Sequence, residues 1–176
     1  MRNRILLTSV LSAFAFTGIA NAQTGSGTLG VTATVQGSIS LTFVTDASGL
    51  AVTGTGTSTA SLPFGAVSMY AGSVPAHVTR TVNGTASFSL ATPFDVQVDL
   101  ANSASTTYTL TATLATADAT NTWSIGATDI SSGASFALTA AGVFGAAVPY
   151  TLKITVPASE VAGLITNSIG FTAVGG

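Results

Sequence analysis

Most of the chain after residue 28 alternates between apolar and polar residues, the pattern of a β-strand with one buried face. The alternation runs through residues 29–35, 39–43, 94–100, 108–114 and 150–156, and a shorter stretch closes the chain at 169–173. In each stretch one set of side chains faces a core, and the other set, rich in Thr, faces solvent. The pattern predicts an all-β protein. Strands repeated at roughly 8–12 residues are typical of an antiparallel sandwich or barrel.

Asn83-Gly84 is the strongest turn signal in the chain. A two-residue loop at this point would split the apolar residues between two faces. A three-residue loop, Asn83 to Thr85, instead pairs Val82 with Ala86 and Val78 with Leu90. We predict the second loop, with a bulge, because a register that splits the apolar set is costly. The only segment compatible with a helical turn is 157–163.

The first 22 residues have the features of a cleaved signal peptide. Arg2 and Arg4 precede an apolar run, which ends in the small-residue triplet Ala20-Asn21-Ala22. The run is shorter than the roughly 18–20 residues that span a membrane. We therefore predict cleavage before Gln23, no membrane span afterwards, and export to the cell surface or the extracellular space.

Composition excludes several classes of function. Charged residues are 6% of the chain, Cys is absent and there is one His. Nucleic-acid binding requires a basic patch, and disulfides or Cys-based metal sites require Cys. Acid–base catalysis requires ionisable groups that converge on one place. We expect no enzyme activity, no nucleic-acid partner, no cofactor and no metal centre.

The few residues able to do chemistry have simpler structural interpretations. The single His, His77, is interpreted as a strand residue beside the Asn83-Gly84 hairpin rather than as part of a triad. Asp95 and Asp99 share one face of a strand; a carboxylate pair or metal site is possible there, but a solvent-exposed strand face is favoured. Three further residues in or near loops offer oxygens for weak calcium binding, without any calcium-loop spacing: Asp118, Asn121 and Asp129.

Aromatic residues allow a second function. Trp123, together with Tyr70, Tyr108 and Tyr150, could stack on sugar rings, although a buried Trp in a sandwich core is the commoner outcome. This alternative is a secreted carbohydrate-binding or surface-binding module. Glycosylation of the Ser- and Thr-rich surface is left open.

Two short motifs carry a family resemblance. Thr32-Ala33-Thr34-Val35 leads into Ser38-Ile39-Ser40-Leu41, and Leu62-Pro63-Phe64-Gly65-Ala66-Val67 follows. This order, with the late strand at 150–156, resembles secreted bacterial pilin-like domains of the spore coat protein U and fimbrial type.

The resemblance implies an Ig-like antiparallel sandwich that lacks one strand. In such families the N-terminal extension of one subunit fills the groove of the next, which is a form of β-augmentation. Residues 23–37 are the candidate extension, and residues 38–176 are the candidate sandwich. The subunit interface would consist of alternating apolar side chains: Leu29, Val31, Ala33 and Val35. That segment is equally well interpreted as the first strand of its own sandwich.

The expected function is thus a structural subunit of a bacterial surface filament, a pilus or fimbria, that acts in cell adhesion. Its main partner would be an identical subunit, and an assembly chaperone stays open as a second partner.

Overall fold

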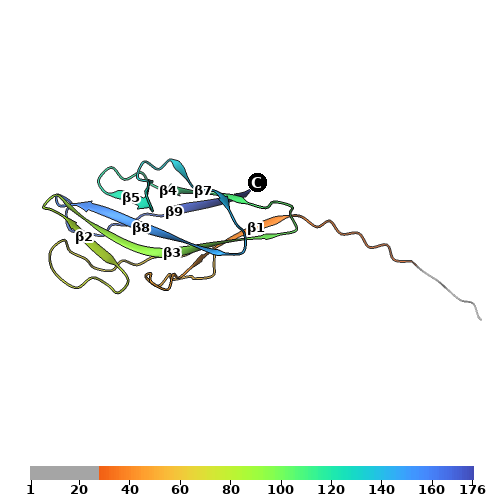
Figure 1. Cartoon of the computed structure of the whole chain (residues 1–176), viewed down its shortest axis with the longest axis horizontal. Helices are drawn as coiled ribbons and strands as arrows, with labels where there is room; N and C mark the ends of the chain where they lie inside the picture. Colours follow the sequence, from red (N-terminus) through yellow and green to blue (C-terminus); the bar gives the residue numbers. More distant parts are fainter. Residues whose placement is uncertain (1–27) are drawn as a thin grey trace, which may run out of the picture. The chain divides into compact units, whose positions relative to one another are not determined.

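A computed structural model of the protein describes residues 28–176 as two antiparallel β-sheets packed face to face (Figure 1). The larger sheet has the strand order β1-β3-β8-β5-β6, with β2 paired to β3 as well, and the smaller sheet has the order β7-β4-β9. The predicted β-sandwich is confirmed, and the described residues contain no helix. The larger sheet consists of β1 (Ser38–Val44), β2 (Thr79–Asn83), β3 (Ser87–Ala101), β5 (Thr122–Ile125), β6 (Thr128–Asp129) and β8 (Ala147–Pro157). The smaller sheet consists of β4 (Tyr108–Leu114), β7 (Ser135–Gly142) and β9 (Ile169–Gly175).

β3 is the longest strand and organises the larger sheet. One of its edges pairs with β8 from Ser87 to Gln97. Its other edge is shared, because β2 pairs with residues 87–91 and β1 with residues 95–101. Pro93 lies in the interval between β1 and β2, where its missing N–H breaks no pairing with either strand. The loop at Gly49 packs closely on the Pro93 carbonyl, leaving no room for a Cβ at Gly49.

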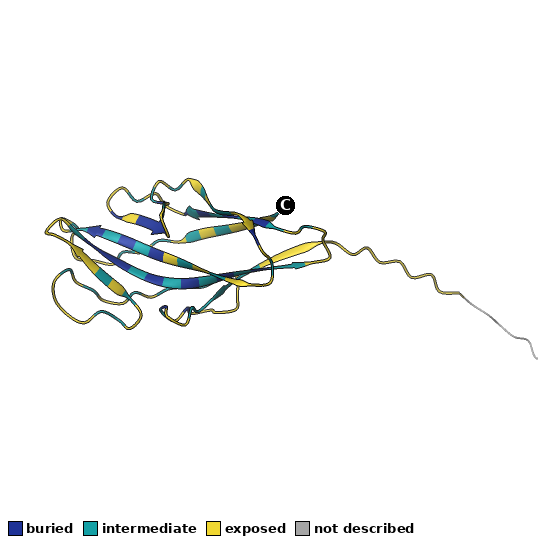
Figure 2. Cartoon of the chain, in the orientation of Figure 1, coloured by how far each residue is buried: buried dark blue, intermediate teal, exposed yellow. Residues whose placement is uncertain are grey.

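The core lies between the sheets and follows the alternation in the sequence (Figure 2). The inward side chains of β3 and β4 are nearly inaccessible to solvent, with Val96, Val98 and Leu110 at 0% exposure. Aromatic rings join the two sheets: Phe171 of β9 meets Phe43 of β1 at 5.2 Å and Phe94 of β3 at 5.9 Å, both edge to face. Burial of these apolar faces supplies the main stabilisation of the sandwich.

The predicted hairpin register is wrong by two positions. Val82 lies opposite Phe88 and Asn83 opposite Ser87, so the loop is 84–86 instead of 83–85. The face of each apolar residue is nevertheless the expected one, because a shift of two preserves the alternation. The segment 157–163 is not helical; a single turn closes there with the Glu160 N–H donating to the Pro157 carbonyl at 3.0 Å.

β1 begins at Ser38, and the described residues before it, 28–37, belong to no strand. Residues 28–34 group with a unit separate from 35–176. The predicted signal peptide, 1–22, and the start of the extension lie outside the described residues. No helix among residues 28–176 has the length and apolar character needed to cross a bilayer.

Candidate functional site

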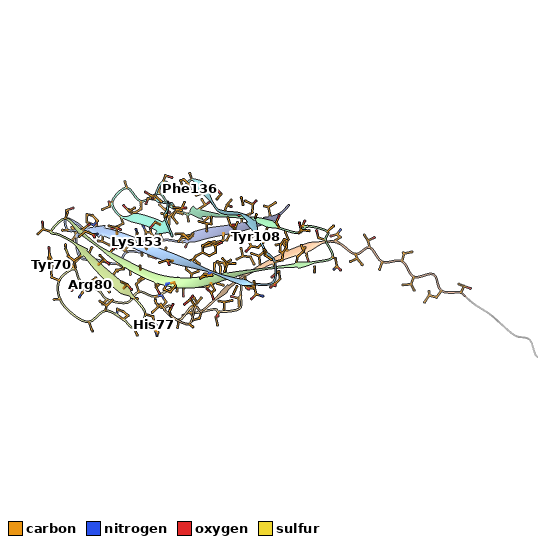
Figure 3. The ribbon with its side chains drawn as sticks, viewed as in Figure 1. Tyr70, His77, Arg80, Tyr108, Phe136 and Lys153 are labelled. Carbon is orange, nitrogen blue, oxygen red and sulfur yellow. The ribbon has the colours of Figure 1, made fainter. Side chains whose placement is uncertain are left out.

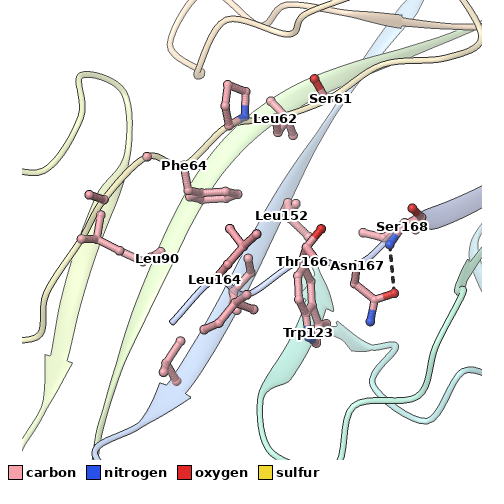
Figure 4. Close-up of a pocket in the computed structure, with 18 of the residues that line it drawn as sticks. Ser61, Leu62, Phe64, Leu90, Trp123, Leu152, Leu164, Thr166, Asn167 and Ser168 are labelled. Atoms are coloured by element: carbon pink, nitrogen blue, oxygen red, sulfur yellow. Dashed lines mark hydrogen bonds between the residues drawn. The ribbon is translucent and has the colours of Figure 1, made fainter. Parts of the chain in front are cut away.

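A large apolar groove opens between the sheets and has a volume of about 1280 Å³ (Figure 4). Clefts for small molecules usually measure roughly 300–1,000 Å³, so this one is large enough for a segment of polypeptide. Its floor is the inner face of the larger sheet. The floor residues are Phe88, Leu90 and Phe94 of β3, Leu152, Ile154 and Val156 of β8, and Trp123 of β5.

Two chain segments without regular secondary structure form the walls of the groove. The first wall, residues 58–70, is extended, with Ala60, Leu62 and Phe64 turned toward the core and Ser61 and Pro63 exposed. The second wall, residues 157–168, connects β8 to β9.

The backbones of both walls have unused hydrogen-bonding groups. No backbone–backbone hydrogen bond is formed within the described chain by residues 62–69 or by residues 161–167. Peptide groups require partners, which are either water or another backbone. Both walls can therefore accept hydrogen bonds from, and donate them to, an added extended segment.

β9 offers a strand edge beside the same groove. It pairs with β4 along its length, and its other side pairs with no described strand. Ile169 and Phe171 of β9 line the groove, whereas Thr172 and Val174 point to the opposite face. An open edge next to an apolar floor is the geometry at which a β-strand can be added.

The groove has almost no charge. Among the described residues that line it, Glu160 alone is charged. Two large apolar side chains of the second wall are exposed to solvent: Val161 at 83% and Leu164 at 90%. An apolar, nearly neutral groove favours an apolar, neutral occupant, because desolvating a charge there is costly.

Arg80 of β2 fixes the far end of the first wall (Figure 3). Its Nη1 donates to the carbonyl oxygens of Ser68 at 2.7 Å and Ala71 at 3.1 Å. The hydroxyl of Ser68 also donates to the Ala71 carbonyl. The loop after residue 67 is therefore held by one cation and not by strand pairing.

The four predicted interface residues lie in the extension and not in the sandwich. Leu29 is 87% exposed, Val31 80% and Val35 71%, and Ala33 is also exposed. None of them belongs to a strand of the described chain. Isolated exposed apolar residues are common on proteins, but three large ones at alternating positions form an apolar face without a cover.

Trp123 is buried and is not a stacking platform. It is 5% exposed, and its Nε1 donates to Oδ2 of Asp118 at 2.8 Å. Oδ2 also accepts from the Asn121 side chain at 3.1 Å, and Oδ1 accepts the N–H groups of Thr120 and Asn121. Burial alone would raise the pKa of Asp118, but these hydrogen bonds prevail and lower it to about 2.

Of the three proposed calcium residues, Asp118 and Asn121 are joined by a hydrogen bond, and Asp129 shares no hydrogen bond with either of them. The carboxylate of Asp118 is occupied by the four hydrogen bonds just described, and Asp129 caps its own turn by accepting from Ser131 N–H at 2.8 Å. Among residues 28–176, no three potential metal-ligating side chains of His, Cys, Asp or Glu form a group. The tyrosines are also dispersed: Tyr108 is 1% exposed within the core, Tyr150 is half-buried beside Phe94, and Tyr70 is 67% exposed on the first wall.

The remaining acidic residues form one pair that the sequence does not indicate. Asp95 faces Asp46, which lies in the loop after β1; burial and the negative charge of Asp46 raise the pKa of Asp95. Asp99 instead accepts both of its hydrogen bonds from the Gln97 amide at 3.1 Å.

In the described chain, His77 forms no hydrogen bond with these carboxylates. It adopts a positive φ of 65° in a turn before β2, and its Nδ1 lies 3.2 Å from the Ser48 carbonyl oxygen. Its placement is that of a turn residue and not the strand residue expected from the sequence.

The chain matches no family model, no curated protein and no solved structure.

Proposed function

We propose that this protein is a structural subunit of an extracellular bacterial filament of the pilus or fimbria type, assembled by β-strand complementation. The extension of one copy would enter the groove of the next copy as an added strand. The observation that carries the proposal is the joint occurrence, in one chain, of an exposed alternating apolar segment and an apolar groove beside an unpaired strand edge. The signal peptide predicted from the sequence and the resemblance to pilin-like domains support the same proposal.

The extension and the groove agree in length and in polarity. From Leu29 to Val35 the extension spans six positions, about 20 Å when extended. The floor of the groove from Phe88 to Phe94 on β3 spans the same number of positions. Residues 23–37 carry no charge, which suits a groove with one charged lining residue.

Chain length favours donation to a second copy. Ser38 lies opposite Ala101, and Leu90 lies eleven positions further along β3, about 36 Å away. Leu29 lies only nine positions before Ser38, which allows about 30 Å even when the chain is fully extended. The extension of the same chain would thus stop short of Leu90 and leave Ala33 and Val35 beside β1. A second copy is free of this limit.

The alternative, a carbohydrate-binding module, has less support. Its main candidate, Trp123, is buried and hydrogen-bonded to Asp118, and Tyr108 is inaccessible. Stacking on a sugar requires an exposed ring face. Of the four aromatic residues considered, only Tyr70 is exposed.

The test is a pair of substitutions on opposite faces of the extension. Val31→Asp places a charge on the face that would enter the groove, and Thr32→Asp places it on the other face. An unpaired buried charge costs about 3 kcal/mol or more, so Val31→Asp should weaken assembly by about a hundredfold or more. Both residues are exposed in the single chain, so neither substitution should change its thermal stability appreciably.

The readout is filament yield, measured by negative-stain microscopy and size-exclusion chromatography on the secreted chain. We expect filaments from the wild type and from Thr32→Asp, and monomers from Val31→Asp. If the wild type stays monomeric, or if Val31→Asp unfolds the monomer, the proposal is refuted.

A further inference from the structure

The second wall of the groove is fixed at its two ends and free between them. At one end, the Ala158 N–H donates to the Ala86 carbonyl at 2.8 Å. At the other end, the side chain of Asn167 pairs with the backbone of Thr116: Nδ2 donates to the Thr116 carbonyl at 2.7 Å, and Oδ1 accepts from the Thr116 N–H at 3.2 Å. The Ala115 N–H then donates to the Ser168 carbonyl at 2.8 Å, which extends the β4–β9 ladder to this point.

The residues between these anchors, 161–166, form a short segment that we call the strap. Its backbone makes no backbone–backbone hydrogen bond in the described chain. Ile165 packs on the core, whereas Val161 and Leu164 project from the rim of the groove with at least four-fifths of their surface in solvent. In Figure 4, Leu164 lies over β8, opposite Phe64 of the first wall.

Exposure of two large apolar side chains at the rim of an apolar groove is costly for a single chain. Folding of their own subunit buries little of the apolar surface of these side chains. They would gain from an occupant of the groove, because an added strand would give them an apolar surface to cover.

We infer that the strap closes over the bound extension of a neighbouring copy, with Val161 and Leu164 as its contact residues. This inference rests on the proposed function and adds the part of the groove that retains the donated strand. Closure needs only a rearrangement of residues 161–166, because the anchors at Ala158 and Asn167 belong to the sandwich.

Single cysteines test this closure directly, since the chain contains no Cys of its own. Leu164→Cys should react rapidly with a maleimide in the monomer, for which Val31→Asp in the same chain supplies a non-assembling form. In assembled filaments its labelling should be at least tenfold slower. Ala127→Cys is the matched control, because Ala127 is exposed in the β5–β6 turn and does not line the groove; its labelling rate should change less than twofold.

A second variant tests whether Leu164 contributes to the affinity of assembly, in addition to being covered in the filament. Leu164→Ser should leave the thermal stability of the monomer unchanged, because the side chain is 90% exposed, and should raise the concentration needed for assembly by about tenfold.

The outcomes of these experiments distinguish the strap inference from the proposed function. If the wild type forms filaments that Val31→Asp abolishes, but Leu164→Cys stays as reactive in filaments as in monomers, the strap inference is overturned and the proposed function stands. If the wild type does not assemble, the proposed function fails and the inference fails with it.

Discussion

The hydrogen-bonded cluster around Asp118 allows a quantitative prediction about stability. Asp118→Asn keeps the shape of the side chain and one acceptor oxygen. It removes the negatively charged carboxylate, which accepts hydrogen bonds from the Trp123 and Asn121 side chains. Both donors belong to buried residues, at 5% and 6% exposure, and a buried donor that loses its acceptor costs about 1–3 kcal/mol.

The depressed pKa of Asp118 reflects the same hydrogen bonds and expresses them as a second magnitude. A decrease from 3.8 to about 2 corresponds to about 2.4 kcal/mol at 1.36 kcal/mol per unit. Asp118 is only half-buried, so screening by solvent reduces this to about 1–2 kcal/mol. The two arguments agree, and we expect Asp118→Asn to lower the free energy of unfolding by about 2 kcal/mol at pH 7.

The pH dependence has a defined sign. The folded pKa is depressed, so the contribution of the carboxylate is fully present above the unfolded value of 3.8 and is lost as pH falls through about 2. The stability difference between wild type and variant should therefore decrease on acidification toward pH 2. Asp129→Asn is the control, because Asp129 is exposed and accepts only from Ser131, and it should have a smaller effect.

The assay is guanidinium unfolding followed by circular dichroism, with a double-mutant cycle that includes Trp123→Phe. The cycle should give a coupling energy of about 1 kcal/mol or more between the Asp118 carboxylate and the indole N–H. Equal stability of Asp118→Asn and wild type at pH 7 would refute the reasoning.

Two further substitutions test the fold. Asp95→Asn should raise the melting temperature at pH 7 and have little effect near pH 3: the folded pKa of Asp95 is raised, so the stability that it contributes is present below 3.8 and is lost as pH rises through the folded pKa. A melting temperature unchanged at pH 7 would contradict the repulsion between Asp95 and Asp46. Gly142→Ala should destabilise the sandwich by about 1–3 kcal/mol or more, because a Cβ there would lie 2.2 Å from Cζ of Tyr108, a ring with no room to move. The free energy of unfolding, measured in guanidinium, checks the second prediction. If Gly142→Ala is as stable as the wild type, the core around Tyr108 accommodates the added Cβ and the prediction is wrong.

Alternation predicted β1, the second half of β3, β4, β8 and β9 together with their buried faces, but it did not indicate β5, β6 or β7, and the alternating stretch 29–35 forms no strand in the described chain. Val96, Leu110 and Leu152 are inward and buried because period-two patterning leaves a single choice of face once one side is apolar. Register was less predictable. Asn83-Gly84 located the hairpin, but the register differs by two positions and the loop by one residue, because a register shift of two keeps the same faces.

The family resemblance implied a groove, but the residues that form it could not be identified from the sequence. Its walls, 58–70 and 157–168, contain apolar residues that suggest strands as readily as loops, and only the tertiary structure shows that their backbones lack partners. The pair formed by Asp46 and Asp95 was missed for a similar reason, since the two residues are 49 positions apart and meet through the loop after β1. Trp123 was predicted to be buried more readily than exposed, but its Asp118 partner depends on a turn that composition does not specify.

Hydrogen–deuterium exchange on assembled wild type and on the Val31→Asp monomer is the most direct test of strand donation. The account predicts that three segments become protected together in the assembly: the extension at 28–36, the first wall at 58–69, and the second wall with the start of β9 at 161–171. The β5–β6 turn together with β6, residues 126–129, serves as the internal reference and should exchange at the same rate in both samples. An extension that exchanges as fast in the assembly as in the monomer, or one already protected in the monomer, would contradict donation between subunits.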